Sequence, residues 1–214
     1  MPVTRLELDA LLQEVSAAAV EEWDEYAERI LEAAEQQFCE FGLRRTSIER
    51  VAEAAGVSRI TLYRRFANRD AVLAAVVARS FRRFIAEFDA EVSSIADPRE
   101  RFVRGVVVAA LLLSRESLLR RLASTDPADT LPLLTTESSP LLAMARSYVA
   151  IQLERARGEG MPIVGDTQML AELLVRVAHS IALNGDTSFG ADEEKLAEFA
   201  RGNLLPMLCG MPAD

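Results

Sequence analysis

Seven arginines lie close together between residues 44 and 69, in a chain that is otherwise acidic. This stretch holds two glutamates, so its net charge is +5, whereas the whole protein of 214 residues carries −9. Arginine binds phosphate oxygens and the edge of guanine, often through two parallel hydrogen bonds. A basic patch in an acidic protein therefore predicts one surface that contacts DNA. The plainer alternative is a solvated helix pair whose arginines serve no partner.

Two short helices are expected to position these arginines. Thr46 is predicted to cap the first helix, and Glu49, three residues later, completes a capping box. Gly56 is predicted to end that helix, because glycine enters the left-handed region without strain. Ser58 is predicted to cap the second helix, which runs to Phe66. Two helices joined by a tight turn with glycine form a helix-turn-helix, whose second helix fits the DNA major groove.

Residues in and around this pair follow a fixed order without gaps. They include Phe41-Gly42, Thr46-Ser47-Ile48, Ala55-Gly56-Val57-Ser58 and Thr61-Leu62-Tyr63. This pattern, over roughly residues 26–76, resembles the DNA-binding domain of the TetR family of bacterial transcriptional repressors. The resemblance implies an all-α fold, in which an N-terminal three-helix helix-turn-helix domain precedes a larger helical domain for ligand binding and dimerisation.

The second helix of the pair is expected to read bases. Arg59 and Arg65 are predicted to contact base edges, and Ile60 or Thr61 a thymine methyl group. Tyr63 resembles the tyrosine that contacts phosphate in the family. Most other contacts are expected at phosphates, which position a protein without reading sequence. The full predicted set is Arg44, Arg45, Thr46, Ser47, Ser58, Arg59, Ile60, Thr61, Tyr63, Arg64, Arg65 and Arg69.

The chain is predicted to have three parts. Residues 1–25 form an acidic helical extension, 26–73 the helix-turn-helix domain, and 74–214 a helical effector-binding and dimerisation domain. One arginine and seven carboxylates give residues 4–26 a net charge of −6, the wrong sign for an arm that enters the minor groove. The extension either packs on protein or regulates DNA binding by repulsion.

Cap and proline signals predict further helices after the helix-turn-helix domain. Their expected ranges are 68–93, from 97 onward, 139–157, 167–183, and from 192 to a kink near Gly202 and Pro206. The helix that starts at Asp97-Pro98 is apolar on every side, which predicts a central, buried position. Arg104 lies inside that apolar region and needs a partner or a cavity.

The family resemblance implies a cavity in the second domain and a dimer made by the last two helices. An apolar lining would favour a small, largely hydrophobic effector. The candidate effector contacts are Phe84, Phe88, Phe102, Arg104, Val106, Leu111, Met144, Tyr148, Arg176 and His179. The candidate interface residues, for which internal packing is the alternative, are Ala171, Val175, Ala178, Ala182, Leu196 and Phe199.

The sequence has no constellation typical of an enzyme, a metal site or a cofactor site. Its one histidine, His179, and its two cysteines, Cys39 and Cys209, cannot build a zinc site of the usual type. The N-terminal segment lacks the apolar core of a signal peptide. The longest apolar run, residues 106–113, is too short to span a bilayer. We therefore expect a cytoplasmic protein that is not an enzyme, with no metal or cofactor and no membrane partner.

These observations together predict a TetR-like transcriptional regulator. We expect a homodimeric repressor that a small hydrophobic effector releases from a palindromic operator in double-stranded DNA. One alternative is a regulator of the same family without a small-molecule effector. A less favoured one is an all-helical enzyme or carrier.

Overall fold

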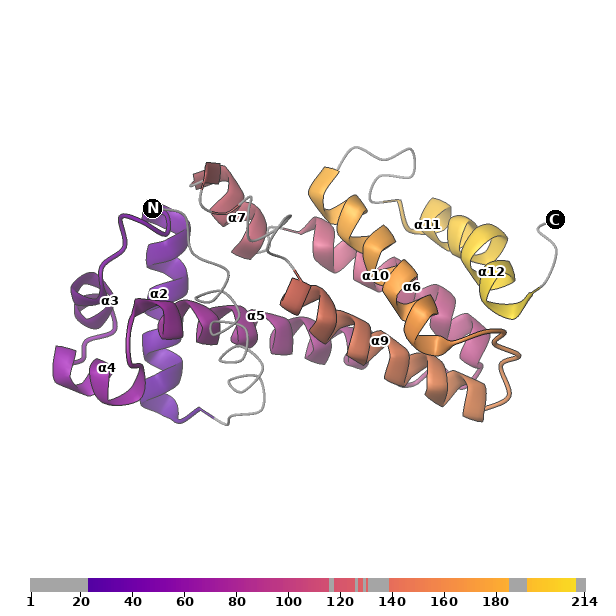
Figure 1. The fold of residues 1–214 in the computed structure, drawn as a ribbon, viewed down its shortest axis with the longest axis horizontal. Helices are drawn as coiled ribbons and strands as arrows, with labels where there is room; N and C mark the ends of the chain where they lie inside the picture. Colours follow the sequence, from indigo (N-terminus) through magenta and orange to yellow (C-terminus); the bar gives the residue numbers. More distant parts are fainter. Residues whose placement is uncertain are drawn as a thin grey trace. The chain divides into compact units, whose positions relative to one another are not determined.

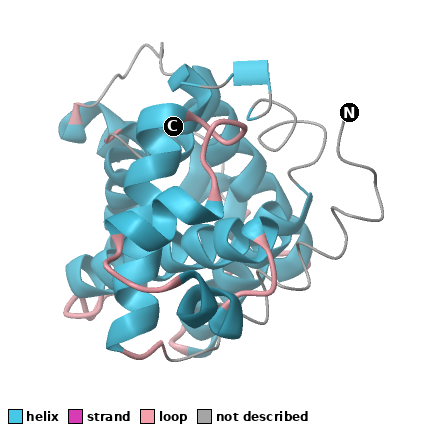
Figure 2. Cartoon of the chain, turned by 90° about the vertical axis from the view of Figure 1, so that its left-hand side faces the viewer, coloured by secondary structure: helices cyan, strands magenta, loops and turns pink. Residues whose placement is uncertain are grey.

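The computed structural model describes residues 23–115, 118–125, 127–128, 130, 139–184 and 192–210, and within these ranges the chain forms helices joined by loops (Figure 1, Figure 2). The predicted all-α fold is confirmed for these residues. The helices are α2 (Glu25–Phe41), α3 (Ile48–Ala54), α4 (Arg59–Arg65), α5 (Arg69–Val92), α6 (Pro98–Ser114), α7 (Leu118–Thr125), α9 (Ser139–Gly158), α10 (Thr167–Asn184), α11 (Glu193–Phe199), the π-helical turn η1 (Ala200–Leu204) and α12 (Leu205–Cys209).

The helices gather into two compact units. The first contains the chain up to residue 83 together with 116–140, and the second contains 84–115 and 141–214. Helix α5 begins in the first unit and ends in the second. Among the helices that the structure describes, none combines the length and apolar character that crossing a bilayer requires.

The first unit has one apolar core, shared by α2, α3, α4, α5 and α7. The largest side chains that are fully buried in it are Ile30, Leu31, Phe38, Val51, Leu62, Leu122, Val72 and Val76. Burying residues of this type contributes roughly 1.5–3 kcal/mol each relative to leaving them exposed. The three helices expected to carry DNA binding are therefore held by a common core and not only by their turns.

Helix α2 has the boundaries that its flanking residues dictate. Asp24 is extended and accepts a hydrogen bond from the backbone N–H of Ala27, and Gly42 ends the helix with φ +85°. The helix predicted over residues 4–26 lies largely outside the described residues. Trp23, at its described end, packs against the core of the first unit under the guanidinium of Arg82, 3.7 Å from the ring centroid.

Helix α7 completes the first unit, although sequence patterning placed its residues with the second domain. Leu118 and Leu122 join the core under α2, and the Thr125 hydroxyl donates to the carbonyl of Cys39 over 2.8 Å. Figure 1 shows α7 beside the upper part of α2. The core that supports the helix-turn-helix is thus closed by a segment that follows α6 in the chain.

Among the described residues of the second unit, α6, α9, α10, α11 and α12 contribute to apolar clusters. Asp97 caps α6, with Pro98 at its first position, and Asp192 caps α11, as the sequence predicted. The kink expected near Gly202 and Pro206 takes the form of the π-helical turn η1. Proline has no N–H to donate four residues back, so the hydrogen-bond ladder shifts, and Leu205 donates to Ala200.

Candidate nucleic-acid interface

Ser47, and not Thr46, caps the first helix of the pair, so the predicted cap was wrong by one residue. The Ser47 hydroxyl accepts from the backbone N–H of Arg50. Thr46 is only 2% exposed, and its hydroxyl lies 3.0 Å from the carbonyl of Gln37 and 2.9 Å from that of Gly42. Its side chain stabilises the end of α2 through these hydrogen bonds and is too buried to contact a phosphate.

Replacing Thr46 by valine should lower the free energy of unfolding of the first unit by about 1–3 kcal/mol, because two carbonyls lose their buried donor while the shape is kept. Urea unfolding followed by the fluorescence of Trp23, the one tryptophan, would measure this loss. Thr61→Val is the control, since Thr61 is partly exposed on α4 and its loss should stay within about 0.5 kcal/mol. Equal stability of both variants would contradict the stabilising role of Thr46.

The turn between α3 and α4 requires glycine at position 56. Gly56 has φ +64°, and a Cβ there would come 3.1 Å from Nη2 of Arg29. That nitrogen donates to the carbonyl of Ala55 over 2.8 Å, which ties α2 to the end of α3. The predicted turn glycine is confirmed, and its tight surroundings fix the angle at which α4 leaves the pair.

Helix α4 turns one face into the core and another to solvent. Ser58 caps it by accepting from the N–H of Thr61 over 3.1 Å, while Leu62 and Phe66 are buried, as predicted. Ile60 is 81% exposed and Tyr63 49% exposed. An isoleucine this exposed on the first turn of a recognition helix is well placed to contact a thymine methyl group.

The arginines around α4 differ in the contacts that they make within the protein. Arg45 donates to the carbonyl of Phe41 over 2.8 Å, and Arg69 to that of Leu43 over 2.8 Å. These two shape the loop between α2 and α3 in addition to any role at phosphate. Arg44 and Arg64 are exposed, and Arg64 precedes Arg65, the last residue of α4.

Two arginines predicted to read bases are paired with carboxylates. Nη1 of Arg59 lies 3.4 Å from Oε1 of Glu49 on α3, and Nη2 of Arg65 lies 2.5 Å from Oδ2 of Asp24. The pKa of Asp24 is lowered by the backbone N–H of Ala27 and then by Arg65. The pKa of Glu49 is lowered first by its own backbone N–H, then by Ser47 and Arg59. Both carboxylates are therefore charged at neutral pH.

Comparison with known proteins identifies this arrangement. The family model described as bacterial regulatory proteins of the tetR family matches residues 30–76, which run from α2 through α4 into α5. The N-terminal domain of this chain belongs to the TetR family. The predicted recognition of that family from the residues around the helix-turn-helix is confirmed.

Two curated relatives are similar to this chain. Both are uncharacterised HTH-type transcriptional regulators of Mycobacterium tuberculosis (strain CDC 1551 / Oshkosh). One is 39% identical over 77 residues, which are 36% of this chain and 38% of that protein. The other is 27% identical over 158 residues, 74% of this chain and 80% of that protein. The first match thus spans well under half of the relative's length.

Solved structures share the fold of this chain at low sequence identity. The fatty acid degradation regulator FadR from Bacillus halodurans has a TM-score of 0.64 at 18% identity, covering 86% of this chain and 98% of its own. The TetR family repressor AlkX from Dietzia sp. strain DQ12-45-1b has a TM-score of 0.61 at 23% identity, covering 88% and 99%. The likeness extends the shared fold through the second unit.

Some of the predicted effector contacts meet one another in the second unit, and others do not. Phe88 stacks near Phe84, with centroids 6.4 Å apart, and meets the edge of Tyr148 at 5.9 Å. The hydroxyl of Tyr148 donates to Asp89 over 2.5 Å. Burial, and then that hydrogen bond, raises the pKa of Tyr148 above its usual range. Sequence reasoning missed Asp89, which lies beside Phe88 on α5.

Two of the predicted polar anchors lie at the surface instead. Arg104 pairs with Glu91 at 2.7 Å and with Glu193 at 2.8 Å, so it joins α5, α6 and α11 by ion pairs. Arg176 is 60% exposed and pairs with Glu172, its i−4 neighbour on α10. Neither side chain is a buried polar anchor, because each forms its ion pairs at the surface of the protein. The remaining candidates, which are partly buried, are Phe102, Val106, Leu111, Met144 and His179.

Three of the six residues predicted for the dimer interface are internal. Ala171, Val175 and Leu196 are buried within their own unit, so the alternative of internal packing applies to them. Ala178 and Phe199 are partly buried, and the side chain of Ala182 lies outside what the structure describes. The residues of α10 that do reach solvent are different ones, Met169 and Leu173 among them.

Proposed function

We propose that this protein is a homodimeric transcriptional repressor in the cytoplasm, which a small, largely hydrophobic effector releases from a palindromic operator. The observation that carries the proposal is the outward face of α4. This short helix presents an exposed isoleucine and arginines to solvent, while Leu62 and Phe66 hold it on the core. Such a helix in a TetR-family domain is suited to the major groove.

The test begins with selection of DNA sites from a random pool by the full-length protein. Binding of the selected palindrome and of unrelated DNA is then measured by fluorescence anisotropy over a range of salt concentrations. A DNA-binding regulator should prefer the palindrome and lose affinity steeply with salt, because counterions are released from neutralised phosphates. An enzyme or carrier would show neither property.

Arg59→Ala and Arg64→Ala should weaken DNA binding in different ways. Arg59 begins α4, where recognition helices meet bases, so its loss should cost about 1–3 kcal/mol on the selected site and little on unrelated DNA. Arg64 lies at the other end, so its loss should weaken binding to all sequences and flatten the salt slope by about 0.9 for each phosphate that is no longer neutralised. Equal weakening by both variants on every sequence would contradict these roles.

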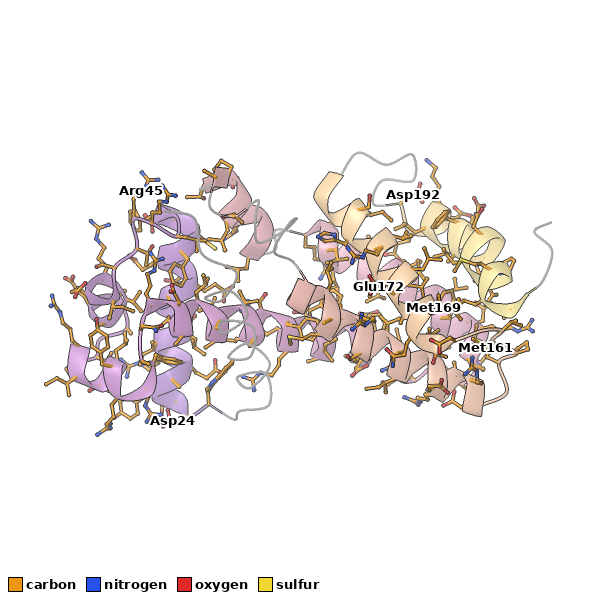
Figure 3. The ribbon with its side chains drawn as sticks, viewed as in Figure 1. Asp24, Arg45, Met161, Met169, Glu172 and Asp192 are labelled. Carbon is orange, nitrogen blue, oxygen red and sulfur yellow. The ribbon has the colours of Figure 1, made fainter. Side chains whose placement is uncertain are left out.

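An apolar patch on the second unit supports the dimer. Val164, Met169, Leu173 and Met207 are exposed on α10, on the loop before it and on α12. The N–H of Val164 donates to the carbonyl of Leu208, and the inner sides of α10 and α12 share one core cluster. Met169 is labelled on α10 in Figure 3. A second copy of this chain would cover such a patch and align two recognition helices on a palindrome.

The hydrophobic effector is supported by the aromatic cluster of Phe84, Phe88 and Tyr148. The cluster lies within the second unit and includes residues of α5, the helix that continues into the DNA-binding unit. A neighbour of the same fold, AibR, has been solved with isovaleryl coenzyme A and operator DNA. An effector acts only if it binds the DNA-incompetent conformation better.

Titrating medium- and long-chain fatty acids and their coenzyme A esters into the protein–palindrome complex tests this part. Release of DNA that Tyr148→Phe weakens would support an effector held beside the Tyr148–Asp89 hydrogen bond. If no apolar compound changes DNA affinity, the regulator without a small-molecule effector becomes the better description.

A further inference from the structure

One carboxylate joins the start of α2 to the end of α4. Oδ1 of Asp24 accepts the N–H of Ala27 over 2.9 Å and so caps α2. Its other oxygen, Oδ2, lies 2.5 Å from Nη2 of Arg65, the last residue of α4. Figure 3 shows Asp24 at the foot of α2. Both oxygens of this one residue are therefore engaged, one in folding and one with an arginine of the DNA-facing helix.

The pair sets a carboxylate in competition with DNA. The Arg65 side chain is 30% exposed and that of Asp24 50% exposed, so a phosphate can approach the same guanidinium. Affinity for DNA depends on the number of phosphates that cations neutralise, and a guanidinium already paired with a carboxylate adds little to that number.

The sequence around Asp24 adds charge of the same sign. Glu25 follows it as the first residue of α2, and Glu21 and Glu22 precede it in the sequence. Consecutive Cα atoms are about 3.8 Å apart, so the covalent chain alone keeps Glu25 near the Asp24–Arg65 pair. Asp24 and Glu25 thus place two carboxylates at the start of α2, next to Arg65.

We propose that Asp24 competes with DNA for Arg65, holding the arginine in the DNA-free protein and lowering affinity for DNA of every sequence. Arg65 then contributes to DNA binding only after its ion pair with Asp24 is broken. In the DNA-free protein its guanidinium is held by the carboxylate and is not positioned to read a base. The proposal rests on the DNA binding proposed above.

Asp24→Asn in the full-length protein is the direct test. Asparagine caps helices as well as aspartate does, so α2 keeps its first hydrogen bond while the charge is removed. We expect the palindrome and unrelated DNA both to bind about two- to five-fold more tightly, the range of an exposed ion pair. The salt slope should steepen by about 0.9 for each arginine that gains a phosphate.

Asp97→Asn is the matched control. Asp97 caps α6 in the second unit by accepting from the N–H groups of Arg99 and Glu100, so its replacement removes the same charge from a similar cap. DNA affinity should not change in this variant. Asp24→Asn combined with Arg65→Ala should lose the gain, because the two residues act as one pair.

The outcomes separate the two proposals. Unchanged or weaker DNA binding by Asp24→Asn overturns the competition, and so does a gain that persists without Arg65. If the unaltered protein shows no salt-sensitive DNA binding, the proposed function fails as well. Thermal unfolding of Asp24→Asn followed by Trp23 fluorescence should remain one cooperative transition, with no more than the small loss of stability that an exposed ion pair contributes, which excludes a folding defect.

Discussion

Leu62→Ala should destabilise the first unit by about 2–5 kcal/mol and abolish DNA binding at growth temperature. Leu62 is fully buried and is the residue of α4 that lies deepest in the core. Truncating a buried leucine removes transfer free energy and leaves a cavity. A helix of seven residues is not stable alone, so α4 depends on the packing of this side chain. Urea unfolding followed by Trp23 fluorescence would measure the change.

Ile60→Ala is the matched control for this experiment. It shortens an apolar side chain two residues earlier on the same helix, at a position that is exposed. Stability should change by less than about 0.5 kcal/mol, whereas discrimination of the selected DNA site should fall. Leu62→Met, which keeps the volume, should cost less than about 1.5 kcal/mol. A stable Leu62→Ala variant would show that α4 is held by something other than this core.

Leu173→Glu should break the dimer and with it most of the affinity for a full palindrome. Leu173 and Met169 lie one turn apart on the exposed side of α10. A charge placed in the centre of a covered apolar patch costs about as much as truncating a strong interface residue, which corresponds to about 30- to 700-fold weaker association. Sedimentation at several concentrations would measure the dissociation constant, and anisotropy would compare the full palindrome with one half-site.

Gln168→Glu is the control, because it adds the same charge to an exposed position beside Met169 on α10. It should remain dimeric and bind the palindrome normally. A Leu173→Glu variant that stays dimeric would place the interface elsewhere. An unaltered protein that is monomeric at all concentrations would instead remove the dimer from the proposed function.

Local signals in the sequence were sufficient for the helix-turn-helix and for most helix starts, but not for the break between α6 and α7, which was expected only near residues 124–127. Caps such as Ser58, Asp97 and Asp192 were correct because a cap and the N–H that it accepts are only two or three residues apart. The glycine turn at Gly56 and the burial of Leu62 follow from backbone sterics and helical spacing in the same way. The one-residue error at Thr46 has the opposite cause, since its partner Gln37 lies on another helix.

Only the tertiary structure determined the contacts between residues that are far apart in the chain. Asp24 meets Arg65, Arg104 meets Glu193, and Leu122 enters the core beneath α2, each across dozens of residues. Ala171 and Val175 on α10 were equally suited to a dimer interface or to a core, and their burial within the unit shows that they belong to its core. Spacing along a helix tells which residues share a face, but not what that face will meet. The amino-acid sequence therefore determined the helix that we propose faces DNA, and the fold determined which of its arginines are already engaged in ion pairs.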